Sequence, residues 1–285
     1  YAWGTWGGPN WYCELGGDNK LKVSAINISE TFNYSILKGL KFSATAGYNT
    51  STATRDTQQK SIEWYNYAGD QLVRTSPTDA ESSYTKTNAR TDFYSVSGHL
   101  EWSHLFADVH DVKVMVGSQY NMKEYEYTYI RAMGILPSLE IPSSKDGLIY
   151  LTSDDKKTNS SKWQEAVLSY FGRANYNYRS KYMLEGQFRY DGSSKFQPEN
   201  RWAFYWGVSG GWRLSEEAFI KKLNFIDELK LRASYGSVGN QSGIDRYDGA
   251  QLYNFKATQG ALLGNGRVSY VDTNGKLPSF DRTWE

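Results

Sequence analysis

The sequence predicts an all-β fold: a transmembrane antiparallel β-barrel, of which this chain supplies about eight strands. Three observations lead to this prediction. Apolar and polar residues alternate with a period of two, aromatic residues gather near the ends of the alternating segments, and short connections alternate with long polar ones. Together these features are typical of strands that cross a bilayer with one face against lipid and the other against an aqueous lumen.

The composition supports this fold class. The 285 residues include 23 Tyr, 10 Trp and 26 Gly, and Tyr and Trp have the apolar body and polar tip that suit a surface between water and lipid. The net charge of +1 argues against a nucleic-acid-binding protein. The single cysteine, Cys13, excludes a disulfide within the chain and a cysteine-based metal site.

Eight segments carry the alternation. In the first, Ile26, Ile28, Phe32 and Tyr34 share one face of an extended strand, and the other face is polar. The other seven segments lie at 40–49, 94–103, 112–123, 166–178, 182–191, 202–213 and 229–235. Each has roughly the ten residues that a tilted transmembrane strand needs.

The connections predict an orientation for the strands. We expect short periplasmic turns at 37–39, 107–111 and 179–181, and long extracellular loops at 50–88, at 124–162 and from 237 onward. Two connections differ: 192–200 is a short outer loop, and 215–227 is a longer inner turn. For the inner turn we expect a helical piece that Ser215 caps.

The strand number predicts a fragment. Strands span a bilayer only in a closed sheet, because unpaired backbone groups are costly in hydrocarbon. Eight strands can close alone, but residues 1–20 and 236–285 are loop-like and the last three residues resemble the start of another strand. We therefore interpret residues 1–285 as the middle of a larger barrel and as an internal part of a longer precursor.

The second half of the chain carries a recognisable series of motifs. They are YFGRANY at 170–176, FRYDGSSKF at 188–196, NRW at 200–202, GGWRLSEE at 210–217, LKLRASYG at 229–236 and GNQ at 239–241. This ordered series resembles the SusC/RagA family of TonB-dependent outer-membrane transporters of Bacteroidota. The first half matches that family in texture rather than in distinctive motifs.

The resemblance implies a 22-stranded barrel in the cell outer membrane, filled by an N-terminal plug domain. It also implies import of a large nutrient, an oligosaccharide or a peptide, with energy delivered through the TonB complex. A SusD-like surface lipoprotein is the implied partner. The plug domain and the remaining strands are expected outside this chain, which would be a part of the barrel domain embedded in outer-membrane lipid.

Two groups of residues are candidates for a functional site. The first group faces the lumen or the plug: Arg173, Glu185, Arg189, Asp191, Arg213 and Arg232. If Tyr178 pairs with Tyr182, Glu185 lies diagonal to Arg173 and close enough to interact. A structural role in holding a plug or a polar wall and a role in direct substrate contact are both open.

The second group consists of aromatic residues in loops, which suit stacking on sugars and also contact between proteins. These candidates for substrate binding are Trp3, Trp6, Trp11, Trp64, Tyr65 and Tyr67. No spacing of the three histidines predicts a metal site, and no nucleophile or carboxylate set predicts an enzyme or a cofactor. An outer-membrane barrel enzyme and a soluble β-rich carbohydrate-binding protein remain the alternatives.

Overall fold

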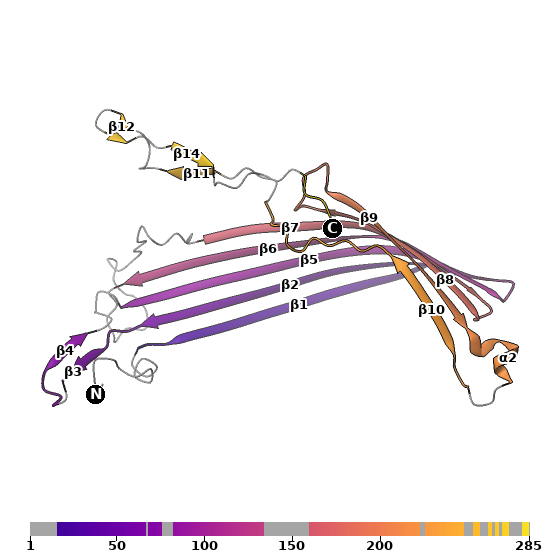
Figure 1. The fold of residues 1–285 in the computed structure, drawn as a ribbon, viewed down its shortest axis with the longest axis horizontal. Coiled ribbons are helices and arrows are strands. Elements are labelled where there is room, and N and C mark those ends of the chain that lie inside the picture. The colour runs from indigo at the N-terminus through magenta and orange to yellow at the C-terminus, as the bar shows by residue number, and fades with distance from the viewer. Residues whose placement is uncertain are drawn as a thin grey trace. The chain divides into compact units, whose positions relative to one another are not determined.

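The fold is an eight-stranded sheet, seen in a computed structural model (Figure 1). The structure describes residues 16–66, 68–75, 82–133, 160–222, 226–247, 253–256, 262–263, 266–267, 270–273 and 281–284. The strands are β1 (Asn19–Leu37), β2 (Leu40–Gln59), β5 (Ser83–Phe106), β6 (His110–Met133), β7 (Ser160–Tyr178), β8 (Tyr182–Ser193), β9 (Trp202–Arg213) and β10 (Lys230–Gly236).

Sequential neighbours pair throughout this sheet, which confirms the predicted β-meander of eight strands. The order is β1-β2-β5-β6-β7-β8-β9-β10, so that β1 and β10 are its edges and the barrel is open in this chain. The described residues also form three sheets of two strands each: β3 (Glu63–Tyr65) with β4 (Leu72–Thr75), β11 (Tyr253–Lys256) with β14 (Tyr270–Thr273), and β12 (Leu262–Leu263) with β13 (Gly266–Arg267). Within the described residues, no helix is long and apolar enough to cross a bilayer.

The chain folds as two compact units, each built from several segments. Unit 1 consists of Tyr1–Ile28, Tyr48–Phe93 and Lys123–Gln164. Unit 2 consists of Ser29–Gly47, Tyr94–Met122 and Glu165–Glu285. Strands β1, β2, β5, β6 and β7 contribute residues to both units, whereas β8, β9 and β10 belong to unit 2 alone.

Unit 2 shows the predicted difference between the two faces of a strand. Antiparallel pairing sets Leu184 opposite Tyr176 and Gly210, and Phe188 opposite Gly172 and Trp206, so apolar and aromatic side chains share one face. These side chains are open to the surroundings: Leu184 is 56% exposed and Phe204 is 58% exposed. A continuous exposed apolar face of this kind is typical of a surface that meets a membrane or another protein.

Three tight hairpins of unit 2 form where short connections were predicted. In two of them the central residues have positive φ, Ala107 and Asp108 in one and Arg179 and Ser180 in the other, as type I′ turns require. The third turns at Gly39, with φ of 84°, and a Cβ there would lie 2.3 Å from the carbonyl oxygen of Ser103. Glycine is therefore required at that turn.

In unit 1 the strands are longer than the sequence analysis predicts. The expected loops 50–88 and 124–162 are wrong in part, because β2 continues to Gln59, β5 already begins at Ser83 and β6 continues to Met133. In the extensions of β2 and β5, polar side chains replace the apolar row, so the alternation of apolar and polar residues that marks a strand in the sequence disappears. Cross-strand hydrogen bonds hold the extensions instead, such as Tyr48 to Asp92 at 2.8 Å and Tyr84 to Asp56 at 2.6 Å.

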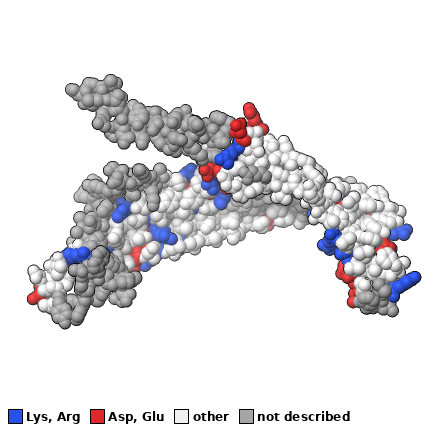
Figure 2. Space-filling view, in the orientation of Figure 1, with Lys and Arg blue, Asp and Glu red and all other residues white. Residues whose placement is uncertain are grey.

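The long inner turn of unit 2 contains the expected helical piece, as η3 (Leu214–Glu216) and α2 (Ala218–Lys221). The predicted capping role of Ser215 is wrong: Ser215 is buried inside η3, and Glu217 precedes α2 without a side-chain capping bond. Charged residues gather over this connection (Figure 2), where Lys181 pairs with Glu217 and Lys221 with Glu216. The Glu217 carboxylate is occupied by side chains from β8 and β9, which leaves it unavailable as a cap.

Candidate functional site

The polar face of β7, β8 and β9 is organised around Arg189. Its Nε donates to the Asp191 carboxylate at 2.8 Å, and its Nη2 donates to the Ser169 hydroxyl at 2.8 Å. Register places Asp191 opposite Ser169 and Arg189 opposite Phe171 and Tyr205. Asp191 is 9% exposed and Ser169 is fully buried, so this ion pair is shielded on its carboxylate side.

The same face has more cationic groups than paired carboxylates. Three buried donor groups on this face have no hydrogen-bond partner among the described residues of the structure: the Nε of Arg173, the Nε of Arg213 and the hydroxyl of Tyr205. A buried donor without an acceptor costs free energy. Contact with a surface rich in hydrogen-bond acceptors would therefore stabilise this face.

The predicted register of β7 and β8 is confirmed. Tyr178 pairs with Tyr182, and the same pairing puts Glu185 opposite Asn175 and Gln187 opposite Arg173. Glu185 therefore lies diagonal to Arg173, as expected. Among the described residues, however, no salt bridge joins the two side chains, and Arg189 with Asp191 forms the ion pair of this face.

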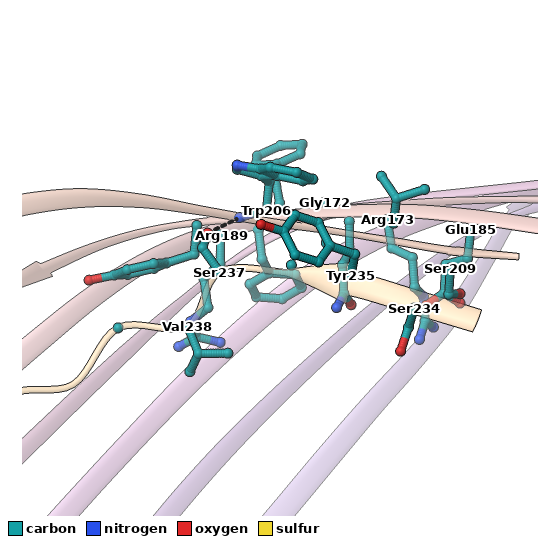
Figure 3. A pocket seen from close by; sticks show the side chains of 18 of the residues that line it. Gly172, Arg173, Glu185, Arg189, Trp206, Ser209, Ser234, Tyr235, Ser237 and Val238 are labelled. Atoms are coloured by element: carbon teal, nitrogen blue, oxygen red, sulfur yellow. Dashed lines mark hydrogen bonds between the residues drawn. The ribbon is translucent and has the colours of Figure 1, made fainter. Parts of the chain in front are cut away.

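A hollow of about 670 Å³ lies along these strands where β10 ends. Arg173, Glu185, Ser209 and Ser234 stand close together at one end, and Arg189, Ser237 and Val238 at the other (Figure 3). In β10, Arg232 lies opposite Gly211 and Lys230 opposite Arg213, which extends the row of cations. The predicted polar residues thus come together on one face of one sheet.

Of the predicted loop aromatics, the structure describes two. Trp64 is 4% exposed, with the guanidinium of Arg74 lying 5.4 Å from its ring centroid across the β3–β4 ribbon. Tyr65 is 36% exposed and donates its hydroxyl to Glu63 at 2.7 Å. The other four, Trp3, Trp6, Trp11 and Tyr67, lie outside the described residues. Substrate contact by this group stays a prediction.

Sequence reasoning missed a carboxylate held by aromatic residues at the short-turn end of unit 2. Glu217 accepts from the Tyr182 hydroxyl at 2.7 Å, from the Trp212 indole N–H at 3.2 Å and from Lys181 at 3.3 Å. The hydrogen bond from Tyr182, supported by those from Trp212 and Lys181, lowers the pKa of Glu217. Only the fold shows this arrangement, because Tyr182 and Glu217 are 35 residues apart.

A second missed cluster lies in unit 1. The rings of Tyr125 and Trp163 stack at 5.2 Å between centroids, and the Lys123 ammonium lies 5.7 Å from the Trp163 ring. A sequence signal for it exists, because KEYEYTYIR at 123–131 alternates with a period of two. The residues that alternate with the tyrosines are Glu124, Glu126, Thr128 and Ile130, and the cations Lys123 and Arg131 end the row, so the segment lacks the purely apolar row of the other strands.

Two of the three histidines pack against aromatic rings. His104 meets Phe106 edge-on at 4.3 Å between ring centroids, and His110 Nδ1 lies 2.7 Å from the Tyr176 hydroxyl. Within the residues that the structure describes, no group of three or more His, Cys, Asp or Glu side chains converges to hold a metal ion.

A comparison with protein-family models identifies the family of the chain. The model described as "TonB dependent receptor-like, beta-barrel" matches residues 1–281. The chain belongs to the TonB-dependent receptor family. The SusC/RagA resemblance of the motifs at 170–241 is confirmed by relatives within that family.

Among these relatives is the TonB-dependent receptor P39 of Formosa agariphila, 29% identical over 263 residues, which cover 86% of this chain and 23% of P39. The TonB-dependent receptor SusC of Bacteroides thetaiotaomicron is 38% identical over 90 residues, or 32% of this chain and 9% of SusC. The chain thus spans about a quarter of the length of P39.

Solved structures of the RagAB peptide transporter have the same fold as this TonB-dependent receptor chain. One superposes with a TM-score of 0.73 at 19% sequence identity, covering 96% of this chain and 28% of the other. A second, of the importer in its closed-closed state, gives a TM-score of 0.72 at 20% identity. At these sequence identities, the likeness shows that the fold is shared and nothing further.

Proposed function

We propose that the full-length protein imports a large nutrient, an oligosaccharide or an oligopeptide, across the bacterial outer membrane in a TonB-dependent manner. The proposed transport is a movement without covalent chemistry, so the protein is a transporter and not an enzyme. Its proposed partners are a SusD-like surface lipoprotein outside the cell and the TonB complex, reached through the plug domain of the parent protein.

The observation that carries this proposal is the contrast between the two faces of unit 2. One face exposes Leu184, Phe188 and Val208, which water would solvate poorly and outer-membrane lipid would accept. The opposite face carries Arg173, Arg189 and Asp191, which suit an aqueous lumen. A sheet built in this way supports a transmembrane barrel wall more than it supports a soluble carbohydrate-binding domain.

The cations of the polar face support contact with a plug. Arg173 and Arg213 retain buried donors without acceptors, and carboxylates or carbonyl groups of a domain inside the barrel would satisfy them. In this proposal Glu185, Arg189, Asp191 and Arg232 belong to the same plug-facing wall.

The partner and the nutrient class are inferred from the relatives. RagAB is a peptide transporter, and SusC is a TonB-dependent receptor. We infer a SusD-like lipoprotein, placed as a lid over the long connections, from the SusC/RagA resemblance of the motifs at 170–241. The loop aromatics Trp3, Trp6, Trp11, Trp64, Tyr65 and Tyr67 are proposed to contact the nutrient or that lid.

The test is uptake by cells that depend on the full-length protein. Deleting its gene should abolish growth on one polymer class, and expression of the intact gene should restore it. Dissipating the proton motive force should stop uptake while leaving surface binding in place. Uptake that continues without a proton motive force would contradict TonB dependence, and a purified protein that stays monodisperse without detergent would contradict the membrane barrel.

A further inference from the structure

Strand β6 carries a row of aromatic residues between two cations. Counting by two, the odd positions are Lys123, Tyr125, Tyr127, Tyr129 and Arg131, and all five side chains are half-buried. Alternate residues of a strand share a face, and their spacing along it is about 6.6 Å. The three tyrosines, with the cations at the two ends, are called the tyrosine row below. The even positions 124, 126, 128 and 130 occupy the other face.

A ring on the neighbouring strand widens this surface. Trp163 of β7 stacks on Tyr125 with an interplanar angle of 22°, and Lys123 lies over the same indole. Aromatic surface therefore spreads across two strands at the Lys123 end. All of these residues belong to unit 1, so the surface is built within one compact unit.

We propose that the tyrosine row together with Trp163 binds a linear acidic oligosaccharide. The inference rests on the proposed import function and names the substrate class for it. Flat rings with polar tips suit sugar rings, which present C–H groups on a face and hydroxyls at the edge. A row of rings along a straight strand fits an extended chain of such units rather than a single small molecule.

The strand position disfavours an extended peptide as the ligand. Peptides commonly bind sheets by adding a strand at an open edge, where backbone groups are available. In this sheet β6 lies between β5 and β7, so it is an interior strand. Recognition at the tyrosine row must therefore pass through side-chain faces, which is how stacked sugar rings would be held.

The charges of the row favour an acidic sugar. Lys123 and Arg131 stand at its ends, and its five positions contain no carboxylate. The Nε of Arg131 is buried and has no hydrogen-bond partner among the described residues. Guanidinium and ammonium groups bind carboxylate and sulfate groups by charge-assisted hydrogen bonds, so uronate-bearing or sulfated sugars match this pattern.

The test uses the purified full-length protein in detergent and measures binding to three probe sets: uronate-bearing and sulfated oligosaccharides, neutral malto- and cello-oligosaccharides, and acidic peptides. At least one acidic oligosaccharide should bind, and Tyr127→Ala and Tyr129→Ala should each weaken it about tenfold, or about 1.4 kcal/mol. Lys123→Gln should reduce the preference for acidic over neutral sugars and flatten the salt dependence.

The matched control is Thr128→Ala, on the same strand between the two tyrosines and on the opposite face. It should leave affinity unchanged, and all variants should show wild-type levels of folded protein in the outer membrane. Binding of neutral sugars alone, binding of peptides alone, or affinity that is unaffected by both tyrosine substitutions would overturn the inference. The proposed import function is judged separately, by energy-dependent uptake in cells, so it can fail while binding persists.

Discussion

Five strands contribute residues to both unit 1 and unit 2, and three of them, β2, β5 and β6, are stabilised differently in each unit. In unit 2 one face is a row of exposed apolar and aromatic residues, including Leu100 and Val116, and the other is polar. In the unit 1 parts of β2 and β5 polar side chains dominate, and hydrogen bonds such as Thr54 to Asn88 at 3.1 Å cross between strands. We infer that the first environment contains lipid and that the second is aqueous.

The comparison shows what hydrophobic alternation reports. Alternation of apolar and polar residues indicates a strand whose two faces lie in different environments. A strand with the same environment on both faces does not show it. Where water lies on both faces, backbone pairing and cross-strand polar contacts suffice, and the apolar signal is lost. For this reason a strand such as β5, with 24 residues, was recognised only in the half that carries an apolar row.

The largest expected effect comes from placing a charge in each unit. Leu184→Arg should destabilise unit 2 by about 2–4 kcal/mol if the position lies near the bilayer midplane. Thr52→Arg, half-buried on β2 in unit 1, should change stability by about 0.5 kcal/mol or less. Urea unfolding of the full-length protein in lipid measures both. Equal effects of the two substitutions would end the distinction between a lipid-facing and a water-facing unit.

The next effect concerns the tight turn of unit 2 at Gly39. Gly39→Ala should cost about 1–3 kcal/mol, because φ is 84° and a Cβ would meet the Ser103 carbonyl oxygen at 2.3 Å. Lys38→Ala, at the exposed neighbouring position, serves as the control and should be nearly neutral. The same unfolding assay measures both, and a neutral Gly39→Ala would show that the turn adopts another conformation in the membrane.

A smaller effect is expected from the polar ladder of unit 1. Tyr48→Phe removes the hydroxyl that donates to Asp92 at 2.8 Å, and should cost about 1 kcal/mol. Tyr235→Phe is the matched change in unit 2, where the ring is 77% exposed, and should cost less than about 0.5 kcal/mol. The reverse order in unfolding measurements would indicate that cross-strand hydrogen bonds do not stabilise unit 1.

The smallest effect depends on pH and involves Glu217. Because its pKa is lowered in the folded state, Glu217 contributes stability above the ordinary pKa of 4.5, and this contribution is lost as pH falls through the lowered value. Glu217→Gln should therefore lower the thermal unfolding temperature at pH 7 and have little effect at pH 3. A constant difference across that range would show that Tyr182 and Trp212 do not hold the charged form.

Much of unit 2 was predictable from the sequence. The predicted segment 202–213 coincides with β9, and 182–191 falls within β8. The pairing of Tyr178 with Tyr182, which the sequence analysis assumed across the short turn 179–181, is the pairing that the structure shows. The candidate residues Arg173, Glu185 and Arg189 could be assigned to one face because side chains alternate along a strand.

Other features could not be predicted because they depend on residues distant in sequence. The Ser215 cap was a local inference, and the cross-strand bonds of Glu217 to Tyr182 and Trp212 replaced it. Arg173 and Glu185 have the expected diagonal register but form no ion pair. The register fixes the positions of the backbones, and the side chains can still choose other partners. The stacking of Tyr125 on Trp163 depends on pairing across a connection of 26 residues between β6 and β7, 134–159.

The sequence alone determined the all-β class, the hairpin order and the sidedness of unit 2, because period two is a local consequence of strand geometry. Tertiary structure decided how far each strand extends, which carboxylate the aromatic residues at the short-turn end hold, and which rings meet across β6 and β7. Those outcomes depend on contacts between strands that are far apart in the sequence, and the sequence of one segment does not specify which segment will pair with it.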